Sequence, residues 1–90
     1  MKYILRAVYR KYGESAKEES LGREIIAVMD GNRNEDEIQG YIRGDIREAE
    51  DIHADIDVFC DDGQHYTAIV RIGLQAQDDW WYEYELEEQP

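Results

Sequence analysis

The chain has 90 residues, 42% of them hydrophobic and 11% aromatic, which is enough apolar surface for one folded domain over residues 1–90 and too little for a second core. Its formal net charge is −12, from 22 acidic and 10 basic residues. A field of this sign repels nucleic acid, nucleotides and anionic membranes and attracts basic protein surfaces, although acidity can also serve solubility alone.

The sequence also points to a compartment. Its longest apolar run, residues 25–29, is far shorter than the roughly 20 residues that span a membrane. Arg6 interrupts the segment in which a secretory signal would need apolar residues, and the single Cys60 has no partner for an internal disulfide. We therefore expect a cytoplasmic protein without contact to a membrane.

Residues 2–12 alternate with the period of a strand, with Tyr3 and Leu5 on one face and Arg6 on the other. We predict a central strand that ends at Gly13. The next stretch, 14–31, is ambiguous, because Ser15 and Glu18 fit a capping box whereas Gly22 interrupts a helix. The pattern favours a short helix over 15–21 and then a strand over 23–29.

The clearest element is an amphipathic helix over residues 34–52. Asn34 is a good N-cap, and the acidic first turn has the sign that the helix dipole favours. We expect Gly40 and Gly44, one turn apart, to let a neighbouring element approach the backbone, and His53 to complement the C-terminal end of the dipole. The apolar stripe that would pack on a sheet consists of Ile38, Tyr41, Ile42, Ile46, Ala49 and Ile52.

Antiparallel strands follow. A three-residue loop at 61–63 would pair Cys60 with Gln64 and Val58 with Tyr66, which matches the apolar faces of the two strands and buries Cys60 as a small hydrophobe. The apolar alternation of the second strand continues from Tyr66 to Leu74. The fold class is thus α+β, an antiparallel sheet of about four to five strands with the 34–52 helix packed on one face.

The last predicted strand starts after a turn at 75–79 and has two unlike faces. Trp80, Tyr82, Tyr84 and Leu86 face inward, and Trp81, Glu83, Glu85 and Glu87 face outward. Like charges at alternate positions repel, so either a basic partner or the cationic first strand, if it is a neighbour, has to offset them. The residues 87–90 are expected to fray.

No constellation for catalysis is evident. Cys60 and His65 fall on opposite sheet faces in the predicted register, so they form no thiol–imidazole pair. A calcium loop starting at Asp55 fails at Phe59, Cys60 and Tyr66, and no zinc spacing or phosphate-binding loop is present. We expect no enzyme, no cofactor and no metal.

Direct binding of nucleic acid could use only the basic and aromatic side chains of the first strand, such as Arg6, Arg10 and Tyr9. The charge of the remaining chain opposes it. Internal ion pairing of that strand with the acidic remainder is the favoured interpretation.

The acidic segments give the functional hypothesis. Residues 34–62 hold eleven acidic residues against Arg43 and Arg47, and residues 78–88 hold six with no basic residue. If the helix and the last strand share a rim, their carboxylates are spaced somewhat like the phosphates of a duplex. The candidate partner-binding residues are Glu37, Asp45, Glu48, Asp51, Asp78, Asp79, Trp81, Glu83, Glu85 and Glu87.

A small acidic α+β chain with carboxylate rows and no catalytic constellation resembles the small phage-encoded inhibitors, namely anti-CRISPR proteins, DNA-mimic antirestriction proteins and, more distantly, acidic nuclease inhibitors. The resemblance covers size and composition and includes no shared motif. It implies a host-cell inhibitor whose acidic side chains occupy the basic nucleic-acid-binding site of a target protein or complex. The alternative is a non-enzymatic interaction module or homodimer, formed through Trp81 and an edge strand.

Overall fold

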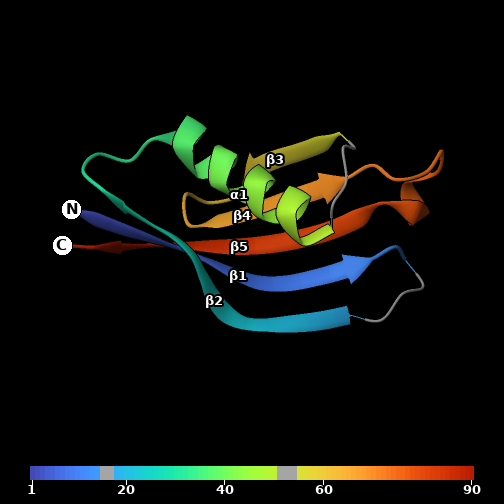
Figure 1. Ribbon diagram of the computed structural model, residues 1–90, viewed down its shortest axis with the longest axis horizontal. Helices are drawn as coiled ribbons and strands as arrows, with labels where there is room; N and C mark the ends of the chain where they lie inside the picture. The colour runs from blue at the N-terminus through green and yellow to red at the C-terminus, as the bar shows by residue number, and fades with distance from the viewer. Residues whose placement is uncertain (15–17, 51–54) are drawn as a thin grey trace.

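The computed structural model describes residues 1–14, 18–50 and 55–90, with the side chains of residues 49 and 50 not included. The strands are β1 (Lys2–Tyr12), β2 (Glu18–Asp30), β3 (Ile56–Cys60), β4 (His65–Val70) and β5 (Trp80–Gln89). The helix α1 spans Glu35–Glu50, and a short 3-10 turn, η1, spans Ala76–Asp78. The predicted α+β class, with one helix on an antiparallel sheet, is confirmed (Figure 1).

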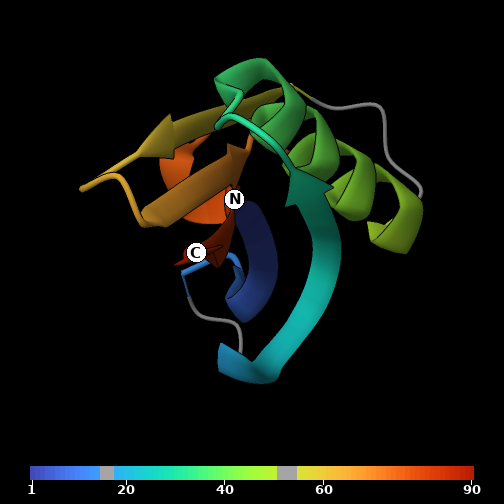
Figure 2. The same ribbon diagram turned by 90° about the vertical axis from the view of Figure 1, so that its left-hand side faces the viewer.

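All five strands belong to one antiparallel sheet in the order β2-β1-β5-β4-β3. The first strand is therefore interior, as predicted, and the last strand lies between β1 and β4. Figure 2 shows that the sheet curls around one side of α1. Within the described residues no helix is long and apolar enough to cross a bilayer.

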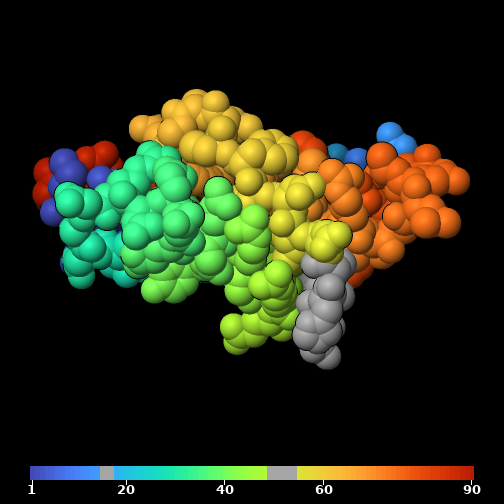
Figure 3. Space-filling view, turned by 90° about the horizontal axis from the view of Figure 1, so that it is seen from above, coloured from blue at the N-terminus to red at the C-terminus, as the bar shows by residue number. Residues whose placement is uncertain are grey.

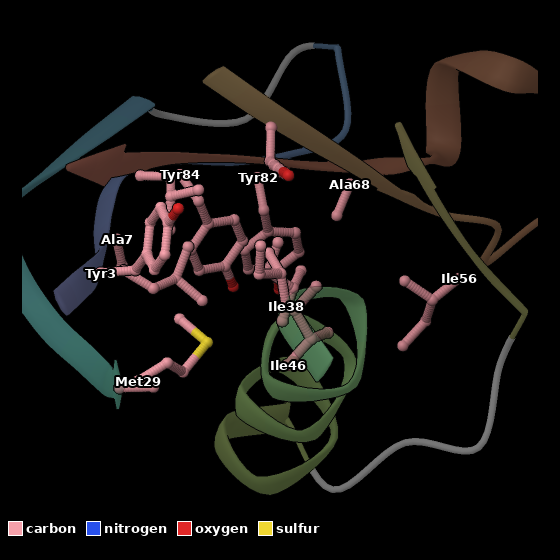
Figure 4. Packing of buried hydrophobic residues seen from close by; sticks show 14 of the residues in the cluster. Tyr3, Ala7, Met29, Ile38, Ile46, Ile56, Ala68, Tyr82 and Tyr84 are labelled. Carbon is pink, nitrogen blue, oxygen red and sulfur yellow. The ribbon is translucent and has the colours of Figure 1, made fainter. Parts of the chain in front are cut away.

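The core lies between α1 and the concave face of this sheet. Ile38, Ile42 and Ile46 come from one stripe of the helix and are almost completely buried. Figure 4 shows Ile38 and Ile46 pointing at the tyrosine rings of the central strand β5. The sheet contributes Tyr3, Leu5, Ala7, Ala27, Met29, Ile56, Tyr66, Ala68, Val70, Tyr82, Tyr84 and Leu86. The alternating pattern of the last strand thus predicted its inward face correctly.

The helix begins as predicted. The side-chain oxygen of Asn34 accepts a hydrogen bond from the backbone N–H of Glu37, at 3.1 Å, which satisfies one of the free donors of the first turn. Ile52 and His53, which the sequence placed at the end of the helix, lie outside the described residues. The long first and last strands also pair to their ends, with Lys2 opposite Gln89. The predicted fraying of the last residues is therefore wrong.

The prediction of a helix over 15–21 is wrong where the chain is described, because residues 18–21 belong to β2. Its Ser15 lies outside the described residues. The extended β1 offers Lys11 and Arg10 as partners, and Glu18 and Glu19 pair with them across the ladder. Two ion pairs and a ladder of backbone hydrogen bonds stabilise the strand over an isolated turn of helix.

The predicted β3–β4 register is also wrong, by two residues. Cys60 lies opposite Tyr66 and Val58 opposite Ala68, so the loop between the two strands consists of residues 61–64. The carboxylate of Asp62 accepts hydrogen bonds from the backbone N–H groups of Gln64 and His65 at 3.0 and 2.9 Å, which closes this longer loop. The strand also ends at Val70, and Ile72 and Leu74 are exposed instead of facing the core.

The side chain of Arg33 joins the start of α1 to the β3–β4 loop. Its guanidinium donates to the carboxylate of Glu35 at 2.6 Å, to the backbone oxygen of Gly63 at 2.6 Å and to the hydroxyl of Tyr66. The Tyr66 hydroxyl donates in turn to Glu35 at 2.7 Å. Figure 3 shows the two segments side by side.

Candidate functional site

The two faces of the sheet differ in their covering. We call the face that packs on α1 the helix side and the opposite face the open face. A bulge at Val8 in β1 changes the orientation of the strand, so that Arg6, Tyr9 and Lys11 all lie on the open face. No helix of the described chain covers the open face.

Ladder partners give the open face an ordered layout. Arg6 and His65 flank Glu85, Tyr9 and Thr67 flank Glu83, and Lys11 and Ile69 flank Trp81. The carboxylate row of β5 therefore lies between cations and aromatic groups of its neighbours. The cationic first strand β1 is a neighbour of β5. The sequence had offered either this neighbour or a basic partner to offset the repulsion within the row.

Two members of the row have a positively charged neighbour. Glu87 is 3.5 Å from the Nε of Arg6, and Glu85 forms an ion pair with Arg23 of β2. Glu85 is also 3.7 Å from the Nε2 of His65, whose Nδ1 lies 2.8 Å from Asp62. The hydrogen bond and charge of Asp62, aided by Glu85, raise the pKa of His65.

Arg23 adopts an unfavourable backbone conformation. It follows Gly22, and both residues have a left-handed φ, +62° for the glycine and +58° for the arginine. That conformation is unfavourable for an arginine. The backbone oxygen of Arg23 accepts a hydrogen bond from Arg6 at 3.3 Å while its side chain reaches Glu85, so this irregular part of β2 is fastened to the open face.

The carboxylates of the helix lie on the other side of the sheet. Glu37 and Glu48 are exposed, and within the described chain neither has an ion-pair partner. Asp45 is half-buried and accepts a hydrogen bond from the hydroxyl of Tyr84 at 2.8 Å. Asp51 lies outside the described residues. The helix and β5 carboxylates therefore do not share one face.

Asp45 is the helix carboxylate whose pKa responds to neighbouring negative charges on the helix side. Burial raises its pKa, and the charges of Glu24 in β2 and Glu48 on the helix raise it further, against the opposing effects of the Tyr84 hydrogen bond and the charge of Arg10. Glu24 joins this cluster because it lies opposite the core residue Ala7 in the ladder. Glu24 was not among the predicted site residues, although its place in the strand predicted over 23–29 was the available signal.

Asp78, Asp79 and Trp81 lie at the end of the molecule formed by η1 and the start of β5. Gly13 and Glu14 at the end of β1 donate backbone hydrogen bonds to Asp79 and Gln77 there, at 3.1 and 2.8 Å. A hollow of about 640 Å³ opens beside this connection on the open face. Its walls include Tyr9, Lys11, Ile69, Asp79, Trp81 and Glu83.

The groups considered for catalysis are not assembled into a site. Cys60 is exposed, so the expected burial of its thiol is wrong, and its sulfur accepts a hydrogen bond from the backbone N–H of Gly63 at 3.1 Å. Cys60 shares a face with its ladder partner Tyr66, whereas His65 lies on the open face opposite Glu85. In the described ranges no cluster of His, Cys, Asp and Glu is arranged to hold a metal ion.

The two helix glycines do not have the expected role within this chain. A Cβ added at Gly40 or Gly44 would meet no atom within 4 Å, so no described element approaches the helix there. Each glycine leaves the helix less stable by about 1 kcal/mol than an alanine would. Both glycines lie on the exposed side of the helix.

Comparison of the chain with protein-family models, with curated proteins and with solved structures finds no match.

Proposed function

We propose that this protein is a non-enzymatic binding protein whose acidic helix side occupies a basic, nucleic-acid-binding surface of a target protein or complex, in the manner of an anti-CRISPR protein or a DNA mimic. The observation that carries the proposal is the uneven compensation of charge. On the open face Glu85 and Glu87 have cationic neighbours, whereas Asp45, Glu24 and Glu48 on the helix side reinforce one another. Like charges held together gain most from a basic partner.

The helix contributes most of this surface. Its sequence contains six acidic residues against Arg43 and Arg47, and Asp36, Glu37 and Glu48 are exposed. Charge-assisted hydrogen bonds from guanidinium and ammonium groups to such carboxylates are about twice as strong as neutral ones. A groove that accepts phosphates can therefore accept this face, while the net charge of −12 opposes binding of the protein to nucleic acid itself.

The experiment is capture of the target with two charge-reversed variants of equal net charge. The test variant carries Glu37→Lys and Glu48→Lys on the helix side. The matched control carries Asp30→Lys and Glu87→Lys, two exposed positions on the open face and outside the hollow described above. Wild-type protein immobilised on beads is expected to retain a nucleic-acid-binding protein from a bacterial lysate, to release it as salt rises, and to release it when a DNA or RNA oligonucleotide competes.

The test variant should lose at least about 90% of this capture, since two reversed contacts cost more than the 1.4 kcal/mol that corresponds to a factor of ten. The control should keep it. Equal loss in both variants would reduce the effect to overall charge, and retention by the helix-side variant, with both proteins folded by circular dichroism, would overturn the proposal.

A second function, self-association, is favoured by one observation. β3 is an edge strand, and Phe59 on its open-face side is 41% exposed. Pairing of the β3 strands of two copies would cover the free strand edge and the Phe59 side chain. Sedimentation equilibrium distinguishes the two functions, because an apolar homodimer keeps its mass as salt rises whereas a complex with a basic partner dissociates.

A further inference from the structure

The hollow on the open face has an aromatic floor and an uncompensated carboxylate. It measures about 640 Å³, which is within the usual size of ligand-binding sites. Trp81 is 38% exposed beside it, and Tyr9 lines it from the neighbouring strand. Glu83 lies directly opposite Tyr9 in the ladder and two residues along β5 from Trp81. Rings and an acid group thus converge from β1 and β5.

Glu83 differs from the other acidic residues of its row. Glu85 pairs with Arg23 and Glu87 with Arg6, but Glu83 has no ion-pair partner in the parts of the chain that are described. The nearby cation of the hollow, Lys11, is directed to Glu18, with 3.8 Å between its Nζ and the carboxylate. Among the outward-facing residues Glu83, Glu85 and Glu87, the one that lines the hollow is therefore the one without an ion-pair partner in the described chain.

The surroundings of Tyr9 report the same negative field. Burial raises the pKa of its phenol, and the charges of Glu18 and Glu83 raise it further. Asp79, another acidic wall of the hollow, is largely buried and lies 3.8 Å from the guanidinium of Arg71. Of the acidic residues that line the hollow, Glu83 and Glu14 have no ion-pair partner in the described chain, and Glu83 is the one that lies beside Tyr9 and Trp81.

We propose that this hollow binds an arginine side chain of the target protein, with the guanidinium on the ring of Trp81 and its N–H groups directed at Glu83. The proposal rests on the proposed function, since it supplies that function with a second contact on the other face of the sheet. A planar guanidinium can stack on an aromatic ring and fork onto a carboxylate at once. A lysine ammonium is a compact, strongly hydrated charge and fits this combination less well.

The test needs no target. N-acetyl-arginine-N-methylamide is titrated into the ¹⁵N-labelled protein, and the indole N–H signal of Trp81 is followed by NMR, assigned by its loss in Trp81→Phe. The neutral isostere N-acetyl-citrulline-N-methylamide is the matched probe. We expect a saturable shift with a Kd of about 1 mM for the arginine compound and no saturation for the citrulline compound. The lysine analogue should bind at least threefold more weakly.

Two variants on the same strand and face complete the design. Glu83→Gln should weaken arginine binding roughly tenfold, whereas Glu87→Gln removes the same charge from a paired position and should leave it unchanged. Equal perturbation by arginine and citrulline, or equal loss in the two variants, would overturn the inference. Its failure is separable from failure of the proposed function, because the helix-side variant Glu37→Lys/Glu48→Lys keeps the hollow intact and loses only the target.

Discussion

The two faces of the sheet differ in what their side chains do, although the same strands build both. The helix side buries tyrosines and isoleucines under α1 and leaves exposed helix carboxylates such as Glu37 and Glu48 without an ion-pair partner in the described chain. The open face has no helix over it in the described chain, and it matches most of its carboxylates with arginine and histidine. Stability therefore comes mainly from one face, and the charge left over for a partner is found where compensation stops.

The largest expected effect is on stability, when the same substitution, isoleucine to alanine, is made on each side of the sheet. Ile42→Ala removes a completely buried side chain and should lower the free energy of unfolding by about 3 kcal/mol. Ile25→Ala removes a side chain that is 56% exposed and should cost less than about 1 kcal/mol. Urea unfolding of both variants measures the contrast, and similar losses would show that the open face is part of the core.

A smaller effect concerns the rim of the helix side. The pKa of Asp45 is raised by burial, so its unfolded form ionises first and stability falls as pH rises from about 3.9 through the folded pKa. Asp45→Asn still accepts the hydrogen bond of Tyr84 and removes the charge. We expect it to be more stable than wild type near neutral pH by up to about 1 kcal/mol, with the difference vanishing in acid.

Thermal unfolding from pH 3 to 8 follows that difference. Glu48→Gln is the matched control, because it removes one of the neighbouring charges from an exposed position and should reproduce only part of the gain. A variant at Asp45 that is less stable than wild type throughout this range would contradict the interpretation.

The smallest effect belongs to the open face. The pKa of His65 is raised by Asp62 and Glu85, so the stabilisation by its charged form is complete below its unfolded pKa of about 6.5 and is lost as pH rises through the folded value. His65→Gln should abolish this dependence, which urea midpoints on either side of neutrality detect. Because the group is exposed, added salt should weaken the effect, and an effect that resists salt would contradict an ionic origin.

Strand alternation made the central part of the fold predictable. β1 and β5 each bury one face, so Tyr3, Leu5, Tyr82 and Tyr84 could be assigned to the core from the period-two pattern. The helical spacing of three and four residues likewise assigned Ile38, Ile42 and Ile46 to the core, but it was wrong for Tyr41, which is 43% exposed. The register of β3 and β4 was not, since a slip of two residues leaves every side chain on its original face and only the loop chemistry of Asp62 decides between the alternatives.

The candidate site was predictable in its residues and not in its arrangement. The outward direction of Glu83, Glu85 and Glu87 followed from alternation, but their pairing with β1 and β2 depends on strand order, which a sequence pattern does not contain. The hollow beside Trp81 depends on the bulge at Val8, which brings Tyr9 to the open face. A break in alternation of one residue has no clear signature in a sequence.

The place of β5 has a consequence for how the chain folds. The hairpins β1–β2 and β3–β4 join neighbours in sequence and can form early, but β5 is the strand that connects them. Its ladder with β1 brings Lys2 opposite Gln89 and therefore closes a loop of nearly the whole chain (Figure 1). Such distant pairing is slow because its entropy cost precedes its reward. Until β5 is synthesised, the edges of β1 and β4 that will pair with it remain unpaired. Truncation of the chain before β5 is therefore expected to leave two hairpins that do not join and that aggregate.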